Sequence, residues 1–246
     1  FVASVVIYSL IMIIDRSIYV QRSINYLLLT KLHLFALAIL ASLRNKNFLV
    51  YLILSCVILF SLFLTHARTN AILGLLLVLY GLFRSISFKK NWLTVSILLF
   101  GLMYLFLYGQ PYIQELKAVQ RIYTDSNSSA MRYELWLNAT RQIDLGSLVI
   151  GHGPGASIEL ANSVGMPYFH NLFLEWIYDY GLCGLALSMF FIFSGVKALS
   201  LLRASDKSIQ VLIALLFLIE LLQFLKSFDG LQIWSLCIMT SLLWKE

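Results

Sequence analysis

Charged residues are scarce in this sequence: Asp, Glu, Lys and Arg make up only 12% of its 246 residues. A soluble domain carries about twice that share, because polar side chains must cover its hydrophobic core. Hydrophobic residues, in contrast, account for 60% of the chain. This balance excludes a soluble enzyme and a disordered regulator, and it indicates an integral membrane protein.

Cysteine is also rare, and no metal-binding motif is present. Cys56, Cys183 and Cys237 lie far apart inside apolar runs, without a CxxC pair or a Cys/His cluster. We interpret them as small buried hydrophobic residues, not as disulfide partners or zinc ligands. The sequence contains no DxD, HExxH, Walker or GxSxG motif. We therefore expect chemistry that uses neither a metal nor a cofactor.

Apolar runs that approach the roughly 20 residues of a membrane-spanning helix recur along the chain. The candidate spans are residues 2–14, 24–43, 48–64, 71–88, 92–108, 181–202, 209–225 and 231–244. They predict an all-α polytopic transmembrane protein with about eight spans and a large extracytoplasmic loop that contains short helices. Because Phe1 already lies in an apolar run, we expect the sequence to be a piece of a longer chain.

The polar stretch between these runs sets the predicted domain organisation. Transmembrane helices occupy residues 1–108, the large loop residues 109–170, and a membrane-entering helix with further spans residues 171–246. With this loop outside, nine loop cations lie inside and four outside, as the positive-inside rule favours. The inner set is Arg44, Lys46, Arg84, Lys89, Lys90, Lys197, Arg203, Lys207 and Lys245, and the outer set is Arg16, Arg22, Arg68 and Lys226. The net charge of +6 therefore orients the helices and does not indicate a nucleic-acid partner.

Two arginines near the outer face are candidate anion ligands. Arg68 lies at a membrane boundary, where it either snorkels to the interface or binds phosphate oxygens with its planar guanidinium. Arg132 and Trp136 stand four apart on a predicted amphipathic helix over residues 130–143. Arg132 either stacks on Trp136 at the surface or faces a lipid-linked phosphate.

A glycine-rich segment follows in the same loop. Gly151, Gly153 and Gly155 alternate within the segment Gly-His-Gly-Pro-Gly, which neither a helix nor a strand favours. The segment is either a structural bend or a cradle in which backbone N–H groups hold a phosphate or a sugar.

A histidine closes the polar loop. His170 and Asn171 immediately precede the predicted membrane-entering helix, whereas His33 and His66 are interpreted as structural. Imidazole is a natural proton acceptor for a sugar hydroxyl near neutral pH. Glu175 and Asp179 follow on this helix and are interpreted as its solvated face, or as a carboxylate that orients His170. Glu220, inside an apolar span, indicates a functional residue or a polar helix interior.

The order of these elements resembles the superfamily of O-antigen ligases and O-antigen polymerases. The resemblance is clearest in Arg132-Tyr-Glu-Leu-Trp136, in the Gly-His-Gly-Pro-Gly segment, and in His170-Asn-Leu-Phe-Leu-Glu followed by Gly181-Leu-Cys-Gly-Leu. It implies a multi-pass glycosyltransferase of the bacterial inner membrane. Its partners would be the lipid bilayer, an undecaprenyl-pyrophosphate-linked glycan and a chain-length regulator.

The resemblance also assigns roles to the candidate residues. It implies that Arg68, Arg132 and His170 are catalytic, with His170 as the base and both arginines on the leaving pyrophosphate. Trp136, Asn171 and the three glycines would contact the substrate. Polymerases add the glycan to another lipid-linked repeat unit, whereas ligases add it to a lipid A core sugar. We favour the polymerase from the sequence around His170, and the ligase is the alternative.

Two functions of other classes fit the same composition. A transporter or flippase would suit polytopic helices with an acidic residue, Glu220, inside a span. Carriers often contain inverted repeats, however, and the sequence shows none. A scaffold that shares the fold without the chemistry is the third hypothesis.

Overall fold

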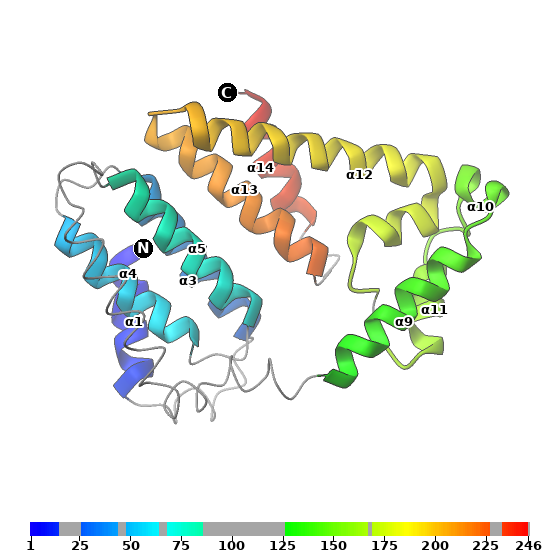
Figure 1. Cartoon of the computed structure of the whole chain (residues 1–246), viewed down its shortest axis with the longest axis horizontal. Coiled ribbons are helices and arrows are strands. Elements are labelled where there is room, and N and C mark those ends of the chain that lie inside the picture. The colour runs from blue at the N-terminus through cyan, green and yellow to red at the C-terminus, as the bar shows by residue number, and fades with distance from the viewer. Residues whose placement is uncertain are drawn as a thin grey trace. The chain divides into compact units, whose positions relative to one another are not determined.

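The computed structural model describes residues 1–14, 26–43, 48–63, 68–85, 126–166, 169–226 and 233–245. All regular elements among these residues are α-helices, which confirms the predicted all-α class. The chain divides into two compact units, Phe1–Thr124 and Asp125–Glu246, and each is described by itself (Figure 1). The division at residues 108 and 170 stays a prediction.

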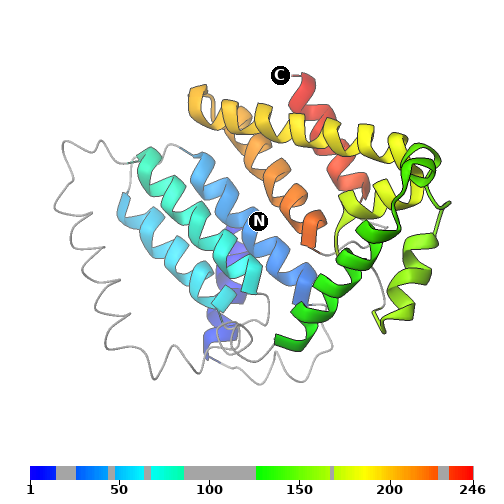
Figure 2. The ribbon, with the colours of Figure 1, turned by 45° about the vertical axis from the view of Figure 1, so that its right-hand side comes forward.

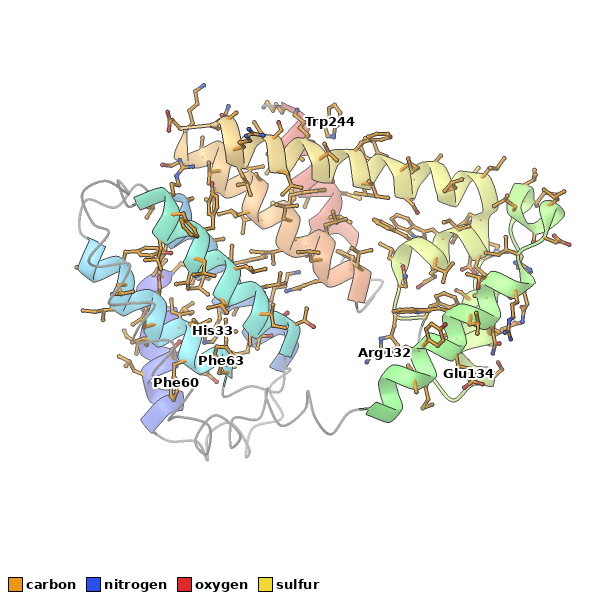
Figure 3. The ribbon with its side chains drawn as sticks, viewed as in Figure 1. His33, Phe60, Phe63, Arg132, Glu134 and Trp244 are labelled. Atoms are coloured by element: carbon orange, nitrogen blue, oxygen red, sulfur yellow. The ribbon has the colours of Figure 1, made fainter. Side chains whose placement is uncertain are left out.

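The described part of the first unit consists of apolar helices at predicted positions. They are α1 (Val2–Ile14), α3 (Tyr26–Ser42), α4 (Phe48–Phe63) and α5 (Arg68–Ser85). The predicted span at 92–108 lies outside the described residues. Polar contacts join the helices, since His33 Nε2 lies 3.0 Å from Ser9 Oγ and Asn70 donates to Thr30 Oγ1 at 2.6 Å. The interpretation of His33 as a structural residue is thus confirmed, and Figure 3 shows it on α3.

The second unit contains the rest of the described helices. They are α9 (Ser126–Gln142), α10 (Leu145–Ile150), α11 (Ala156–Ser163), α12 (Leu172–Ala204), α13 (Ser208–Lys226) and α14 (Ile233–Lys245). The helix predicted over 130–143 is α9, which begins four residues earlier. Short helices inside the large polar stretch are therefore present as predicted.

Two helices of the second unit are long and apolar enough to cross a membrane. They are Leu172–Ala204 and Ser208–Leu225, while shorter apolar helices occur at Leu29–Ser42, Val50–Phe63, Thr69–Arg84 and Ser235–Lys245. The expectation of eight spans stays a prediction. Phe193, Val196 and Leu199 of α12 are each more than half exposed, as lipid-facing side chains are.

The prediction that the cysteines are buried is wrong. Cys56, Cys183 and Cys237 are free thiols on the exposed faces of their helices. A helix in a bilayer presents apolar side chains both to its neighbours and to lipid, so an apolar run does not reveal which face is buried.

Helix α12 is interrupted by a kink at Gly181, where φ is 56° and ψ is −129°. The kink separates a short arm, residues 172–180, from a long arm, residues 182–204. The two arms fold toward one another, as Figure 2 shows, and a side chain at Gly184 would collide with the backbone carbonyl of Trp176. Glycine at 184 therefore permits the close contact between the arms.

Two hydrophobic cores hold the second unit together. The first joins the long arm to α13 and α14 through residues such as Phe191, Phe217 and Leu236. The second joins α9, α11 and the short arm through residues that include Leu135, Ala161, Met166, Phe169 and Tyr178. This second core positions the segments that carry the candidate site residues of the second unit.

Candidate functional site

Helix α9 carries Arg132 and Trp136 one turn apart on a single face. The fully buried Leu135 and Ala139 fix the orientation of the helix on the second core. Trp136 Nε1 donates a hydrogen bond of 3.0 Å to the carbonyl oxygen of Phe169. The face that bears Trp136 is thereby held against the turn that contains His170.

His170 occupies a constrained position in this turn. Its φ of 61° is in the left-handed region, and its side chain is only 5% exposed. This conformation costs about 1–2 kcal/mol for a residue other than glycine, and such strain concentrates at functional sites. Phe169 in the core precedes it, and Asn171 follows as the N-cap of α12, with Oδ1 accepting from Leu174 N at 3.2 Å. The backbone is thus fixed before His170 by the hydrophobic core and after it by the N-cap of α12.

Arg132 is half-buried on the same face of α9 as Trp136. Among the described residues, its buried Nε has no hydrogen-bond acceptor. In Figure 3, Arg132 and Glu134 project from opposite sides of the helix. Because guanidinium is always charged, donors left over in a half-buried position suit an anionic ligand.

The glycine segment folds onto the end of the short arm of α12. His152 N donates to Tyr178 O at 2.9 Å, Gly153 N to Asp179 O at 3.1 Å, and Gly155 N to Asp179 Oδ2 at 3.1 Å. The segment, residues 151–155, is therefore a structural bend, which we call the glycine bend. Two of its N–H groups bind backbone carbonyls of the short arm, and the N–H of Gly155 binds the carboxylate of Asp179.

Asp179 is the anchor of this bend. In addition to Gly155 N, its carboxylate accepts from Ser157 N at 2.8 Å and from Ser157 Oγ at 3.0 Å. Asp179 is only 5% exposed, so its interpretation as part of a solvated face is wrong. These three donors satisfy the oxygens of the buried carboxyl group, as its burial requires.

Close backbone approach explains two glycines at this junction. Gly151 has a φ of 86°, and a Cβ there would collide with the carbonyl oxygen of Asp179. A Cβ on Gly181 would lie 2.6 Å from the carbonyl oxygen of Leu148. Any side chain at either position would push the bend away from the kink of α12.

Tyr178 connects the bend to α9. Its hydroxyl donates to Gln142 Oε1 at 2.5 Å, and its ring stacks on the imidazole of His152 at a centroid distance of 4.1 Å. Tyr178, Gln142 and Ser157 were not identified from the sequence. They carry no motif of their own, and only the fold brings them together.

Glu175 lies on the short arm, before the kink and outside the long arm that is itself long enough to span a bilayer. Its side chain is half-buried, and its Oε2 has no hydrogen-bond partner among the described residues.

Arg68 and Glu220 are the other two candidate residues from the sequence. Arg68 begins α5 in the first unit, and its side chain lies outside the described residues. Glu220 is buried within α13. In the described part of the chain, no three His, Cys, Asp or Glu side chains come together as a metal site would require.

Asp179→Asn should loosen the glycine bend. An amide replaces one of the two acceptor oxygens with a donor that faces other donors, and each unsatisfied buried group costs about 1–3 kcal/mol. We expect faster hydrogen exchange of the amides of Gly155, Ala156 and Ser157 in the purified protein, measured by mass spectrometry.

The matched control for this exchange experiment is Glu159→Gln, at an exposed acidic residue of α11. It removes the same charge without removing a buried acceptor, so exchange should stay at the wild-type rate. Unchanged protection in Asp179→Asn would show that the carboxylate does not hold the bend.

Comparison with known proteins identifies the family. No curated protein and no solved structure matches the chain. The model of the family described as O-antigen ligase matches residues 50–190, which is more than half of the chain and includes α9, the glycine bend, His170 and the kink of α12. The chain therefore belongs to the O-antigen ligase family, in the superfamily of O-antigen ligases and polymerases.

Proposed function

We propose that this protein is an inverting glycosyltransferase that takes a glycan from undecaprenyl pyrophosphate in the bacterial inner membrane. One observation carries the proposal: the Trp136–Phe169 hydrogen bond ties the helix face that bears Arg132 to the turn that bears His170. A cation suited to phosphate and an imidazole suited to proton transfer are thus carried by two segments that pack in the same hydrophobic core.

In the proposed reaction, the oxygen of an acceptor hydroxyl attacks the anomeric carbon of the lipid-linked sugar. A glycosidic bond forms, the bond from the anomeric carbon to the pyrophosphate oxygen breaks, and His170 takes the hydroxyl proton. Undecaprenyl pyrophosphate leaves with the bonding electron pair. A single displacement from the side opposite the leaving group inverts the anomeric configuration.

The arginines offset the charge that grows on the departing pyrophosphate. Arg132 supplies guanidinium donors from α9. The same role for Arg68 rests on the family resemblance alone. This role needs no metal ion. Trp136 holds the His170 turn, while the N-cap Asn171 keeps its amide nitrogen for contact with the sugar.

The glycine bend has a supporting role in this scheme. Its N–H groups at His152, Gly153 and Gly155 are engaged by the short arm of α12. We propose that the substrate contacts the outer side of the bend, because nothing lies within 4 Å of the position that a Cβ would take at Gly153 or Gly155.

For the acceptor, we propose the growing end of another lipid-linked repeat unit, which makes the protein a polysaccharide polymerase with its loop on the extracytoplasmic side. A chain-length regulator would then act on its product. Transfer to a lipid A core sugar is the second candidate, and the description of the matched family as O-antigen ligase favours it.

The purified protein, reconstituted in vesicles with an undecaprenyl-pyrophosphate-linked repeat unit, tests this proposal. We expect a ladder of longer glycans, release of undecaprenyl pyrophosphate, and an anomeric configuration at each new linkage opposite to that of the donor. A parallel reaction with lipid A core acceptor gives one capped product if the protein is a ligase.

Three other outcomes would contradict parts of the proposal. Retention of configuration would exclude direct displacement. Movement of the lipid-linked unit across the membrane without bond formation would identify a flippase. Neither movement nor a new bond with any acceptor would identify a scaffold.

A further inference from the structure

Helix α10 presents an unusual surface for a short helix. None of its residues is buried, and Leu145, Val149 and Ile150 are 83%, 56% and 79% exposed. We define these three side chains as the apolar face of α10. Full burial of one such side chain is worth about 1.5–3 kcal/mol, so their exposure to water would be a substantial cost.

This helix is held in place by polar and backbone contacts. Asp144 caps it, with Oδ1 accepting from Ser147 N at 2.7 Å, and Ser147 Oγ accepts from Asp144 N at 2.8 Å. At its C-terminus, the backbone of Leu148 and Gly151 packs against Gly181. A helix of this length is not stable alone, so these contacts fix it at the kink of α12.

The position of the kink in α12 determines the depth of α10 in a bilayer. From Leu182 to Ala204, the long arm extends roughly 34 Å at 1.5 Å per residue, enough for a hydrocarbon core of about 30 Å. Arg203 at its far end and Lys207 in the turn that follows are exposed cations, which belong outside the hydrocarbon. The kink therefore lies at the opposite membrane interface, and α10 lies there too.

The long arm of α12, whose kinked end lies beside α10, also presents exposed apolar side chains. Next to the kink, Leu182 is 47% exposed, and Leu187 and Phe190 extend the same kind of surface along the long arm. Figures 1 and 2 both show α10 at this end of α12. Exposed apolar side chains are thus present both on the spanning arm and on the helix beside its kinked end.

We propose that α10 is an interfacial anchor whose apolar face inserts into the bilayer leaflet at the kinked end of α12. Short helices with an apolar side and polar flanks bind in this way, with their apolar side chains at the boundary between headgroups and acyl chains. Asp144 remains on the headgroup side, since its pKa is lowered by hydrogen bonds from Ser147 and it is ionised at neutral pH. The inference does not depend on the proposed transfer reaction.

The anchor has a consequence for the candidate site. Gly151 directly follows α10 and makes the contact with Asp179 that begins the glycine bend. Insertion of α10 therefore holds this bend at the depth of the lipid headgroups, where the phosphates of any lipid-linked substrate also lie.

Spin labelling of the full chain in vesicles of phosphatidylethanolamine and phosphatidylglycerol tests the anchor. The native thiols are first removed by Cys56→Ala, Cys183→Ala and Cys237→Ala, which disturb no buried packing because all three are exposed. A nitroxide is then attached to Ile150→Cys, and its collisions with oxygen and with a water-soluble nickel chelate are compared by power saturation.

Two further labelled variants calibrate the measurement. Leu187→Cys reports a lipid-facing position on α12, and Glu159→Cys reports an exposed position on α11. We expect the ratio of oxygen to nickel accessibility at residue 150 to exceed the ratio at residue 159 several-fold and to approach that at residue 187.

Each alternative occupant gives a different result. A ratio at residue 150 equal to that at residue 159 means that water covers the face, and low accessibility to both reagents means that protein covers it. Dipolar broadening that disappears on dilution with unlabelled protein means that a second copy covers it. Any of these three results would overturn the anchor.

Discussion

His170→Ala is expected to lower the rate of glycan transfer by about 10²–10⁴-fold, the usual contribution of a positioned general base. His170 is buried at a left-handed backbone position between Phe169 in the core and the N-cap Asn171. Removal of the imidazole leaves those neighbours in place. We therefore expect the turnover number to fall while the affinity for the lipid-linked donor stays near that of the wild type.

The backbone conformation at this position supplies a control for misfolding. Asn tolerates a φ near 60° better than most residues, so His170→Asn should fold at least as well as the wild type. It still lacks a group that accepts a proton at neutral pH. Transfer by His170→Asn at a rate near that of the wild type would rule out the base assignment.

Arg132→Lys is expected to lower the turnover number by about 10²-fold, the order of effect seen when one charge-stabilising donor is lost. Lysine keeps the positive charge but has a single ammonium group in place of the planar guanidinium fork. The buried Nε of Arg132, which has no acceptor among the described residues, has no counterpart in lysine. The measurement is steady-state transfer at several donor concentrations.

Arg141→Lys is the matched control for this change. Arg141 belongs to the last turn of the same helix and is exposed, so its replacement should leave transfer unaffected. An equal effect of both substitutions would indicate a general requirement for arginine on α9. Full activity of Arg132→Lys would contradict bidentate phosphate binding at this position.

The helices could be predicted well from the sequence, because a bilayer demands long apolar runs. The predicted run at 2–14 coincides with α1, and the runs at 48–64 and 209–225 differ from α4 and α13 by at most one residue at each end. The faces of those helices could not be predicted. Cys56 lies in the apolar run that forms α4, yet it is exposed, because lipid and protein neighbours favour the same residues.

The sequence offers candidate residues for the site but not the contacts between them. The sequence placed Arg132, Trp136 and His170 in one polar stretch, and the structure joins the last two through the carbonyl of Phe169. Such a bond from a side chain to a distant backbone atom leaves no periodic signal. Contact of these residues with substrate stays a prediction.

Asp179 shows most clearly what a linear pattern misses. Its spacing from Glu175 suggested one solvated helix face, but the chain reverses at Gly181 and the glycine bend covers Asp179. The signal that could have revealed the buried role of Asp179 is its position just before two glycines, Gly181 and Gly184, that stand three residues apart. Gly181 and Gly184 mark the place where backbone segments meet.

The most direct test of the central claim is chemical rescue of His170→Gly. Glycine relieves the left-handed strain and leaves a space of the size of the missing imidazole. If His170 accepts the proton from the attacking hydroxyl, the variant is inactive alone, and added imidazole restores transfer in proportion to the fraction of imidazole that is unprotonated. If the variant transfers glycan without imidazole, or if imidazole has no effect at any pH while donor binding is normal, the claim is contradicted.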